Sequence, residues 1–150
     1  MAEQPIWHGS FVAELSPRAQ EKIFAEAEML QYKAGTTVFR EGDQSQNLFI
    51  VKSGHVVLEI SVPPKGKRSV LTVGPGELFS WSALVEPRIE NASARASVDT
   101  EALRIDGGTL MKLCEEDSPL GFEVYRTLAK VISSRLIATR LQFLDVFQVG

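Results

Sequence analysis

The fold class is decided by two neighbouring stretches of sequence, TTVFREGD at residues 36–43 and LFIVKSG at residues 48–54. Both contain a run of β-branched and aromatic residues followed by a glycine, as strands bounded by tight turns do. Gly42 and Gly54 stand where a tight turn needs a positive φ, which glycine adopts without strain. The pair therefore predicts two consecutive strands of an antiparallel sheet.

The same pattern continues along the chain to residue 105. Four further runs of this kind, bounded by turn-forming residues, lie at 55–60, 69–73, 93–98 and 101–105. Short strands at this spacing are typical of antiparallel barrels and rolls. From the inward faces of these runs we expect a core that includes Val38, Phe39, Leu48, Ile50, Val56, Leu58, Leu71 and Val73.

Helical patterns flank the β region on both sides. Residues 15–30 are predicted to form a helix, with Ser16 as its N-cap and Pro17 at its first helical position. A short helix is predicted over residues 108–114, and a long helix begins at Pro119 and runs to about residue 147.

The long helix carries a stripe of mostly apolar residues at spacings of three and four. This spacing is typical of a coiled-coil-like seam, which predicts a homodimer through the helix. The alternative is that the stripe packs only on the roll of its own chain. The stripe consists of Ala129, Ile132, Leu136, Thr139, Phe143 and Val146.

Length and composition place the chain among ordinary globular domains. It has 150 residues, of which 44% are hydrophobic and 23% charged, and its formal net charge is −3. The single cysteine, Cys114, excludes an internal disulfide and a cysteine-based zinc cluster. No signal peptide and no run of 18 apolar residues is present, so we expect a cytoplasmic protein without a membrane span.

Four local motifs, in the right order, resemble the cyclic-nucleotide-binding domain family. The first two resemble the opening strands of that family, the third its phosphate-binding cassette, and the fourth the long helix of catabolite-activator-type regulators. The matching segments are residues 34–43, 48–56, 74–78, and the pair 135–136 with 143–146. The resemblance covers roughly Leu15 to Phe147.

The resemblance implies an α+β, mainly β fold. This fold is an antiparallel β-roll, a double-stranded jelly-roll of the cupin-like kind, with an N-terminal helix and a long C-terminal helix. We expect one domain over residues 1–150, with the N-terminal helix at about 15–30, the β-roll at about 34–106 and the C-terminal helices at about 108–147.

The resemblance also implies a binding site for cAMP or cGMP. A cyclic phosphate needs backbone N–H groups at a helix N-terminus and a cation, best an arginine. In the family, the glutamate after the cassette glycine accepts the ribose hydroxyl, and Gly76 and Glu77 match these two positions. The alternative interpretation is that Glu77 is an ordinary acidic residue near a helix N-terminus, where its charge is favourable. The expected ligand-binding residues are Gly76, Glu77, Leu78, Arg88, Asn91, Ala92 and Thr139.

The cassette departs from the family's pattern where the phosphate should bind. When Asn91 and Ala92 are aligned with the small residues that follow the family's arginine, Glu90 stands at the arginine position. A carboxylate there would repel a phosphate. Either Arg88, two residues earlier, supplies the cation, or the pocket has changed its ligand, or it has lost one.

Three further side chains have two interpretations each. Phe79 and Trp81 are bulky where the family's loop is compact, so they either line or plug the pocket or belong to the core beneath it. Thr139 falls near the place where the family's long helix closes over the base, and its alternative is a small residue in the helix seam.

We therefore expect a regulatory sensor that binds a cyclic nucleotide or a related small ligand. The alternative is a degenerate member that binds no nucleotide and acts as a protein-interaction or dimerisation scaffold. No catalytic motif is present, and neither His8 nor His55 lies in a metal-binding pattern, so we expect no enzyme activity, metal or other cofactor. Without a helix-turn-helix segment after the long helix, the acidic chain is not expected to bind DNA by itself. The expected partners are a second copy and an unidentified protein.

Overall fold

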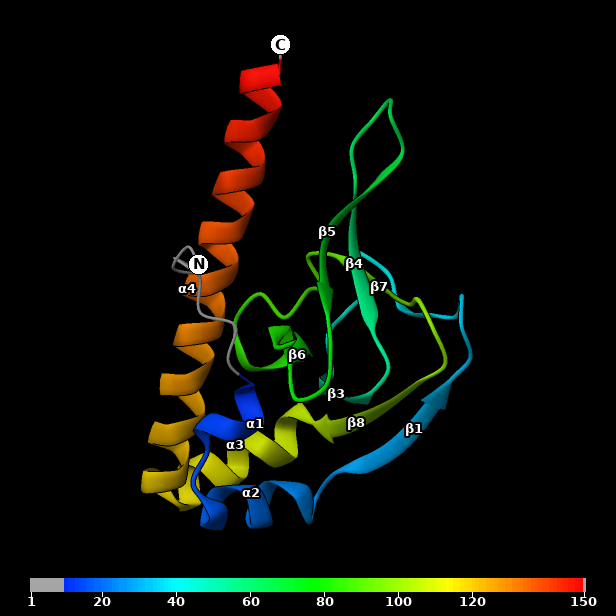
Figure 1. Cartoon of the computed structure of the whole chain (residues 1–150). Helices are drawn as coiled ribbons and strands as arrows, with labels where there is room; N and C mark the ends of the chain where they lie inside the picture. The colour runs from blue at the N-terminus through cyan, green and yellow to red at the C-terminus, as the bar shows by residue number, and fades with distance from the viewer. Residues whose placement is uncertain (1–9, 150) are drawn as a thin grey trace, which may run out of the picture.

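The protein is a β-roll with its helices gathered along one side (Figure 1). The structure is a computed structural model that describes residues 10–149, with side chains through Leu141 and at Leu144. The helices are α1 (Phe11–Glu14), α2 (Pro17–Phe24), the single 3-10 turn η1 (Ser82–Leu84), α3 (Gly107–Glu116) and α4 (Ser118–Val149). None of the helices described is both long enough and apolar enough to cross a membrane.

The described strands form two antiparallel four-stranded sheets, which confirms the predicted fold class. One sheet has the strand order β1-β8-β3-β6 and the other β2-β7-β4-β5. The strands are β1 (Glu28–Tyr32), β2 (Thr37–Phe39), β3 (Asn47–Ser53), β4 (Val56–Ser61), β5 (Lys67–Val73), β6 (Leu78–Ser80), β7 (Ser93–Ala96) and β8 (Thr100–Asp106).

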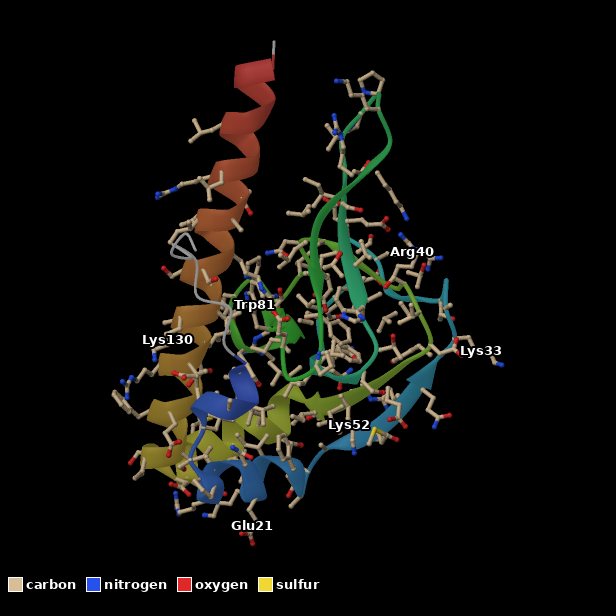
Figure 2. All side chains as sticks on the ribbon, in the orientation of Figure 1. Glu21, Lys33, Arg40, Lys52, Trp81 and Lys130 are labelled. Carbon is tan, nitrogen blue, oxygen red and sulfur yellow. The ribbon has the colours of Figure 1, made fainter. Side chains whose placement is uncertain are left out.

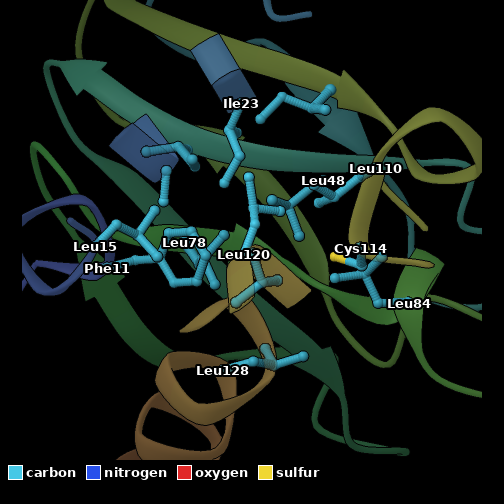
Figure 3. Close-up of a cluster of buried hydrophobic side chains, with 14 of the residues drawn as sticks. Phe11, Leu15, Ile23, Leu48, Leu78, Leu84, Leu110, Cys114, Leu120 and Leu128 are labelled. Carbon is cyan, nitrogen blue, oxygen red and sulfur yellow. The ribbon is translucent and has the colours of Figure 1, made fainter. Parts of the chain in front are cut away.

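Strand β3 is buried on both of its faces. Phe49 and Val51 belong to the cluster inside the roll, whereas Leu48 and Ile50 belong to a second cluster shared with the helices. Side chains alternate between the two faces of a strand, so a strand covered by helices on its outer face reads as a continuous apolar run. Figure 3 shows Leu48 and Leu78 of the sheet beside Ile23, Leu110 and Leu120 of the helices.

The predicted core residues are buried as expected. Of the eight, Leu48, Ile50, Val56, Leu58 and Val73 are buried, and Val38, Phe39 and Leu71 are partly buried against the cluster inside the roll. The expectation that all of them face inward is wrong for Leu48 and Ile50. These two point out of the roll toward the helices, because the helices, and not the second sheet, cover that face of β3.

The predicted N-terminal helix is too long. Ser16 caps α2 as expected, with its Oγ accepting from the Ala19 N–H, but the helix ends at Phe24. Residues 28–32 form β1, which pairs along its length with β8. The edge of β8 offers backbone hydrogen bonds to this segment, and Leu30 packs on the cluster inside the roll. Tertiary pairing therefore overrides the helical spacing that ran through Leu30.

Helix α4 changes its surroundings along its length. Leu120, Val124, Leu128 and Val131 are buried in the core shared with the other helices. Beyond them, α4 and the β4–β5 hairpin extend in the same direction from the body of the protein (Figure 1). The helix therefore begins as a core element, and beyond Val131 it contributes residues to the wall of a cavity.

Candidate ligand-binding site

A cavity of about 370 Å³ lies between the roll and α4. This volume is within the range of small-molecule binding sites. Strands β4 and β5, the segment 81–92 and the helix all contribute to its wall. The lining residues are Leu58, Ile60, Val70, Leu71, Trp81, Asn91, Ala92, Ile132, Arg135, Leu136, Ala138 and Thr139.

Arg135 is the cation in this wall. Its Nη2 donates to the carbonyl oxygen of Leu78, and its guanidinium carbon lies 5.1 Å from the centre of the Trp81 ring. Its Nη1 is buried and has no hydrogen-bond partner among the residues described. Burial lowers the pKa of Arg135 from 12.5 to about 10, and the nearby charge of Glu77 acts in the opposite direction. Arg135 therefore stays charged at neutral pH.

The register of α4 explains why an arginine reaches this position. The buried residues Leu120, Val124, Leu128 and Val131 follow one another at helical spacings of four, four and three. The next step of four along the same face is residue 135. The packed core has ended at this level of the helix, so the arginine side chain faces a cavity.

Trp81 forms the wall between the roll and the helix. Figure 2 shows it on the side of the roll that faces α4. The indole lies face-on to the Arg135 guanidinium, an arrangement in which the ring's quadrupole attracts the cation. Phe79, two residues earlier, is buried and stacks on Phe49 with ring centres 5.2 Å apart. Trp81 is therefore a lining residue, and Phe79 belongs to the core, where it also borders a smaller cavity.

The cassette residues Gly76, Glu77 and Leu78 do not line the cavity. Gly76 has a φ of +84°, and a Cβ there would collide with Ser10, whose Oγ donates to the Gly76 carbonyl oxygen over 3.0 Å. The Glu77 carboxylate accepts from the Gly74 N–H over 3.0 Å and so closes its own turn. The chain then enters β6 instead of a helix, and Leu78 is fully buried.

Glu90 is a buried carboxylate that borders the smaller cavity and not the larger one. Its side chain accepts from the Ser80 Oγ over 2.8 Å, and the residue is 5% exposed. Burial raises the pKa of Glu90, while hydrogen bonds from Ser80 and Ser45 act in the opposite direction. A second cavity, of about 20 Å³, lies next to Glu90 and has room for roughly one water molecule. An anion placed there would meet negative charge and little space.

Arg88 lies outside the cavity wall. It has a φ of +62° and follows Pro87 in the loop between η1 and β7. Its Nη2 lies 3.4 Å from the Met111 sulfur on α3, and its Nε lies 3.5 Å from a Glu86 carboxylate oxygen. Arg95, the other nearby cation, pairs with Glu59 over 3.1 Å and is also absent from the wall.

The structure brings together four of the residues singled out in the sequence: Trp81, Asn91, Ala92 and Thr139. It adds Arg135, which the sequence motif marked only as part of the long helix. The spacing of four residues from the buried Val131 is the sequence signal that could have predicted Arg135 on the cavity side of α4. No group of three or more histidine, cysteine, aspartate or glutamate side chains is arranged to hold a metal ion within the part of the chain that the structure describes.

A family model described as the cyclic nucleotide-binding domain matches residues 29–117, more than half of the chain. This match covers the roll, the cassette and α3. The chain therefore belongs to the cyclic nucleotide-binding domain family.

Individual relatives agree with the family. The chain is 32% identical over 105 residues to the cyclic AMP receptor protein of Thermus thermophilus, covering 70% of this chain and 46% of that protein. The solved structure of the Thermus thermophilus catabolite activator protein matches with a TM-score of 0.75 and 30% identity, over 92% of this chain and 62% of that one. A cyclic nucleotide-binding domain from Methylobacillus flagellatus shares the fold, with a TM-score of 0.82 at 19% identity over 90% of this chain and 79% of that one.

These relatives are longer proteins. The chain spans 46% of the length of the Thermus receptor protein and 57% of a transcriptional regulator from Mycobacterium tuberculosis. The activities and partners of these longer proteins are therefore not established for this chain by its likeness to them.

Proposed function

We propose that this chain is a regulatory sensor module that binds a small ligand between the β-roll and α4. The observation that carries the proposal is that both the roll and the helix contribute to the wall of one cavity. A ligand in that cavity contacts both elements at once. Its binding free energy then favours the position of α4 in which those contacts form.

Helix α4 is the element that would report the occupancy of the cavity. Up to Val131 the helix is anchored by buried apolar side chains. From Ile132 to Thr139 it contributes five residues to the cavity wall instead of to a packed core. A ligand would supply the packing that this part of the helix lacks, and the ordered helix would carry the change to a partner.

A cavity-filling substitution tests this coupling without a known ligand. Ala138→Phe places a ring in the cavity, and we expect it to slow amide hydrogen exchange in α4 from residue 132 onward. Ser133→Phe is the matched control, because Ser133 is exposed on the same helix and does not line the cavity. Equal exchange in the two variants and the wild type would contradict the proposed coupling.

Family membership makes cAMP and cGMP the first ligands to titrate. In that version of the proposal, Glu77 holds the ribose hydroxyl and Arg88 the phosphate, with the N–H groups after Glu77 facing the same phosphate. Both side chains would have to turn toward the cavity when the nucleotide binds. We expect Arg88→Ala to weaken nucleotide binding about ten- to a hundredfold, and Glu90→Arg to tighten or create it. Calorimetric titration of the full chain with each nucleotide measures both effects.

The scaffold function is the second candidate, and Glu90 is the observation that favours it. A buried carboxylate at the position of the family's arginine opposes a phosphate. If neither nucleotide gives heat and Ala138→Phe leaves the hydrogen exchange of α4 unchanged, the domain acts through its surface and not through its cavity.

Whether the chain is a sensor or a scaffold, we expect it not to bind duplex DNA by itself. A salt-dependent binding assay with duplex DNA checks this expectation.

A further inference from the structure

The wall of the cavity combines one partly buried cation, Arg135, with an apolar surface. Of the twelve described residues that line it, nine are apolar, and the other three are Asn91, Arg135 and Thr139. The apolar residues come from both sides of the cavity: Leu58, Ile60, Val70, Leu71, Trp81, Ala92, Ile132, Leu136 and Ala138. A ligand complementary to this wall has an apolar body and a single anionic group.

The guanidinium of Arg135 is held in place with one donor left over. The Leu78 carbonyl oxygen and the Trp81 ring fix the orientation of the group. Its buried Nη1 has no acceptor among the described residues. A buried donor without a partner is costly, and a ligand oxygen that accepts from it removes that cost. A carboxylate is suited to this position, because one of its oxygens accepts a charge-assisted hydrogen bond from Nη1 and its charge offsets that of the guanidinium.

We propose that the ligand of this cavity is an apolar monocarboxylate, whose carboxylate binds Arg135 and whose body lies between the β4–β5 hairpin and α4. This inference rests on the proposed sensor function, since it names the ligand class of the same cavity.

The remaining polar groups argue against a nucleotide as the ligand. The sugar and base of a nucleotide carry many donors and acceptors, and burying them without partners costs free energy. Among the described residues, the side chains of the wall offer them only Asn91 and Thr139 besides Arg135. Glu90 adds a carboxylate beside the smaller cavity, next to Asn91 and Ala92. An ionised Glu90 disfavours an anionic group at that end, so the favoured place for negative charge in the ligand is beside Arg135.

Three eight-carbon probes separate the contributions of charge and apolar area. Octanoate, octanol and octylammonium have the same chain and differ in their head groups. We expect octanoate to bind the wild-type chain about ten- to a hundredfold more tightly than octanol, as a charge-assisted hydrogen bond would add. Octylammonium should bind more weakly than octanol. Calorimetry measures the affinity for each of the three probes. Thermal-shift measurements rank the same three affinities independently.

Variants of Arg135 test where the carboxylate binds. Arg135→Gln should reduce the affinity for octanoate to that for octanol, and Arg135→Lys should restore part of the preference because it keeps the charge. Arg140→Gln is the matched control, since Arg140 is exposed on the same helix and does not line the cavity. If Arg135→Gln does not fold, the preference for octanoate over octanol is compared between the wild type and Arg135→Lys.

The outcomes separate this inference from the proposed function. If Ala138→Phe orders α4 while octanoate and octanol bind equally, the sensor function stands and the carboxylate assignment fails. The assignment also fails if none of the three probes binds, if Arg140→Gln removes the preference as Arg135→Gln does, or if cAMP or cGMP binds more tightly than octanoate. A preference for octanoate that depends on Arg135 supports it.

Discussion

At the scale of single residues, the two cavities are distinguished by groups of opposite sign: the partly buried Arg135 lines the larger one and the buried Glu90 lines the smaller one. Arg135 has a free donor at the helix side, and Glu90 is hydrogen-bonded to Ser80 beside the smaller cavity. When Asn91 and Ala92 are aligned with the family's pattern, Glu90 falls at the expected arginine position. A carboxylate at that position disfavours a cyclic phosphate.

Burial of Glu90 gives the stability of the protein a pH dependence. Its pKa is raised above the usual value of 4.5, so the folded state holds this proton more tightly than the unfolded state. The contribution of Glu90 to stability is therefore fully present below pH 4.5 and is lost as the pH rises through the folded-state pKa. Glu90→Gln keeps an acceptor for Ser80 and carries no charge. We expect the variant to have a higher free energy of unfolding than the wild type at pH 7.

Urea denaturation at several pH values measures this difference. The advantage of Glu90→Gln should disappear below pH 4.5, where the wild-type carboxyl is protonated in both states. Glu86→Gln is the control, because the Glu86 side chain is 81% exposed, and it should show no such trend. A Glu90→Gln variant less stable than the wild type at pH 7 would show that the ionised carboxylate is stabilised by its hydrogen bonds.

Part of the site could be predicted from single residues. Trp81, Asn91, Ala92 and Thr139 line one cavity, as the order of the cassette motif and the long helix suggests, and their role in ligand binding stays a prediction. The orientation of Glu77 could not be predicted, since it depends on a hydrogen bond to Gly74 within its own turn. Arg135 was missed because its importance comes from where the core ends along α4.

At the scale of elements, β3 supports both hydrophobic clusters. Ile50 is fully buried against the helices and pairs in register with Leu78 and Leu103. We expect Ile50→Ala to lower the free energy of unfolding by about 2–5 kcal/mol, the usual cost of such a truncation in a core. Ile89→Ala, at a residue 43% exposed, should change it by less than about 0.5 kcal/mol. Equal effects in chemical denaturation would contradict the placement of Ile50.

The junction of α2, α3 and α4 is joined by Asp117. This residue ends α3, and its carboxylate accepts from Arg18 and Lys22 of α2 and from the Leu120 N–H in the first turn of α4. The hydrogen bond from Lys22, over 2.7 Å, is the largest cause that lowers the pKa of Asp117 from 3.8 to about 2. One carboxylate thus fixes the start of the long helix relative to α2.

We expect acid to weaken this junction. The stability contributed by Asp117 is present above pH 3.8 and is lost as the pH falls to about 2, because the folded pKa is the lower one. Asp117→Asn keeps the acceptor for Leu120 but not the charge, so it should be less stable at pH 7 and converge with the wild type near pH 2. Thermal denaturation from pH 7 to pH 2 measures this, with Glu116→Gln, an exposed neighbour, as the control. Parallel curves for wild type and Asp117→Asn would contradict the assignment.

Elements with a strong local signal were predicted well. The turns at Gly42 and Gly54 do have positive φ, and the strand runs and the two C-terminal helices are present with small shifts of their ends. Strands β1 and β6 were missed. β1 carries a helical spacing that its pairing with β8 overrides, and β6 is a three-residue strand held by β3. The residues of β1 and β6 alone do not show that these segments pair with β8 and β3.

At the scale of the whole molecule, α4 presents an exposed apolar stripe. Phe122 is 66% exposed and Leu136 is 54% exposed, with Tyr125, Ala129 and Ile132 between them at spacings of three and four. The exposed apolar stripe therefore begins at Phe122, earlier than Ala129, the first residue of the predicted seam. Of its other residues, Thr139 is exposed, whereas the side chains of Phe143 and Val146 lie outside the described residues. We propose that this stripe is the interface of a homodimer.

A charge on the stripe tests the dimer. Ala129→Glu places a carboxylate near its symmetry mate without touching the cavity, so we expect it to convert the dimer to a monomer in light scattering at micromolar concentration. Ala13→Glu is the matched control, because Ala13 is exposed on α1. A wild-type chain that is already monomeric would contradict the proposal, as would an Ala129→Glu variant that remains a dimer.

Ile132, Leu136 and Thr139 contribute to the cavity wall and also belong to the stripe. If both proposals hold, selection acts on these three positions for two traits at once. A substitution that suits a new ligand must also suit the neighbouring copy. Divergence in ligand preference should therefore accumulate at Leu58, Ile60 and Leu71 on the opposite wall, while the helix positions change more slowly during evolution.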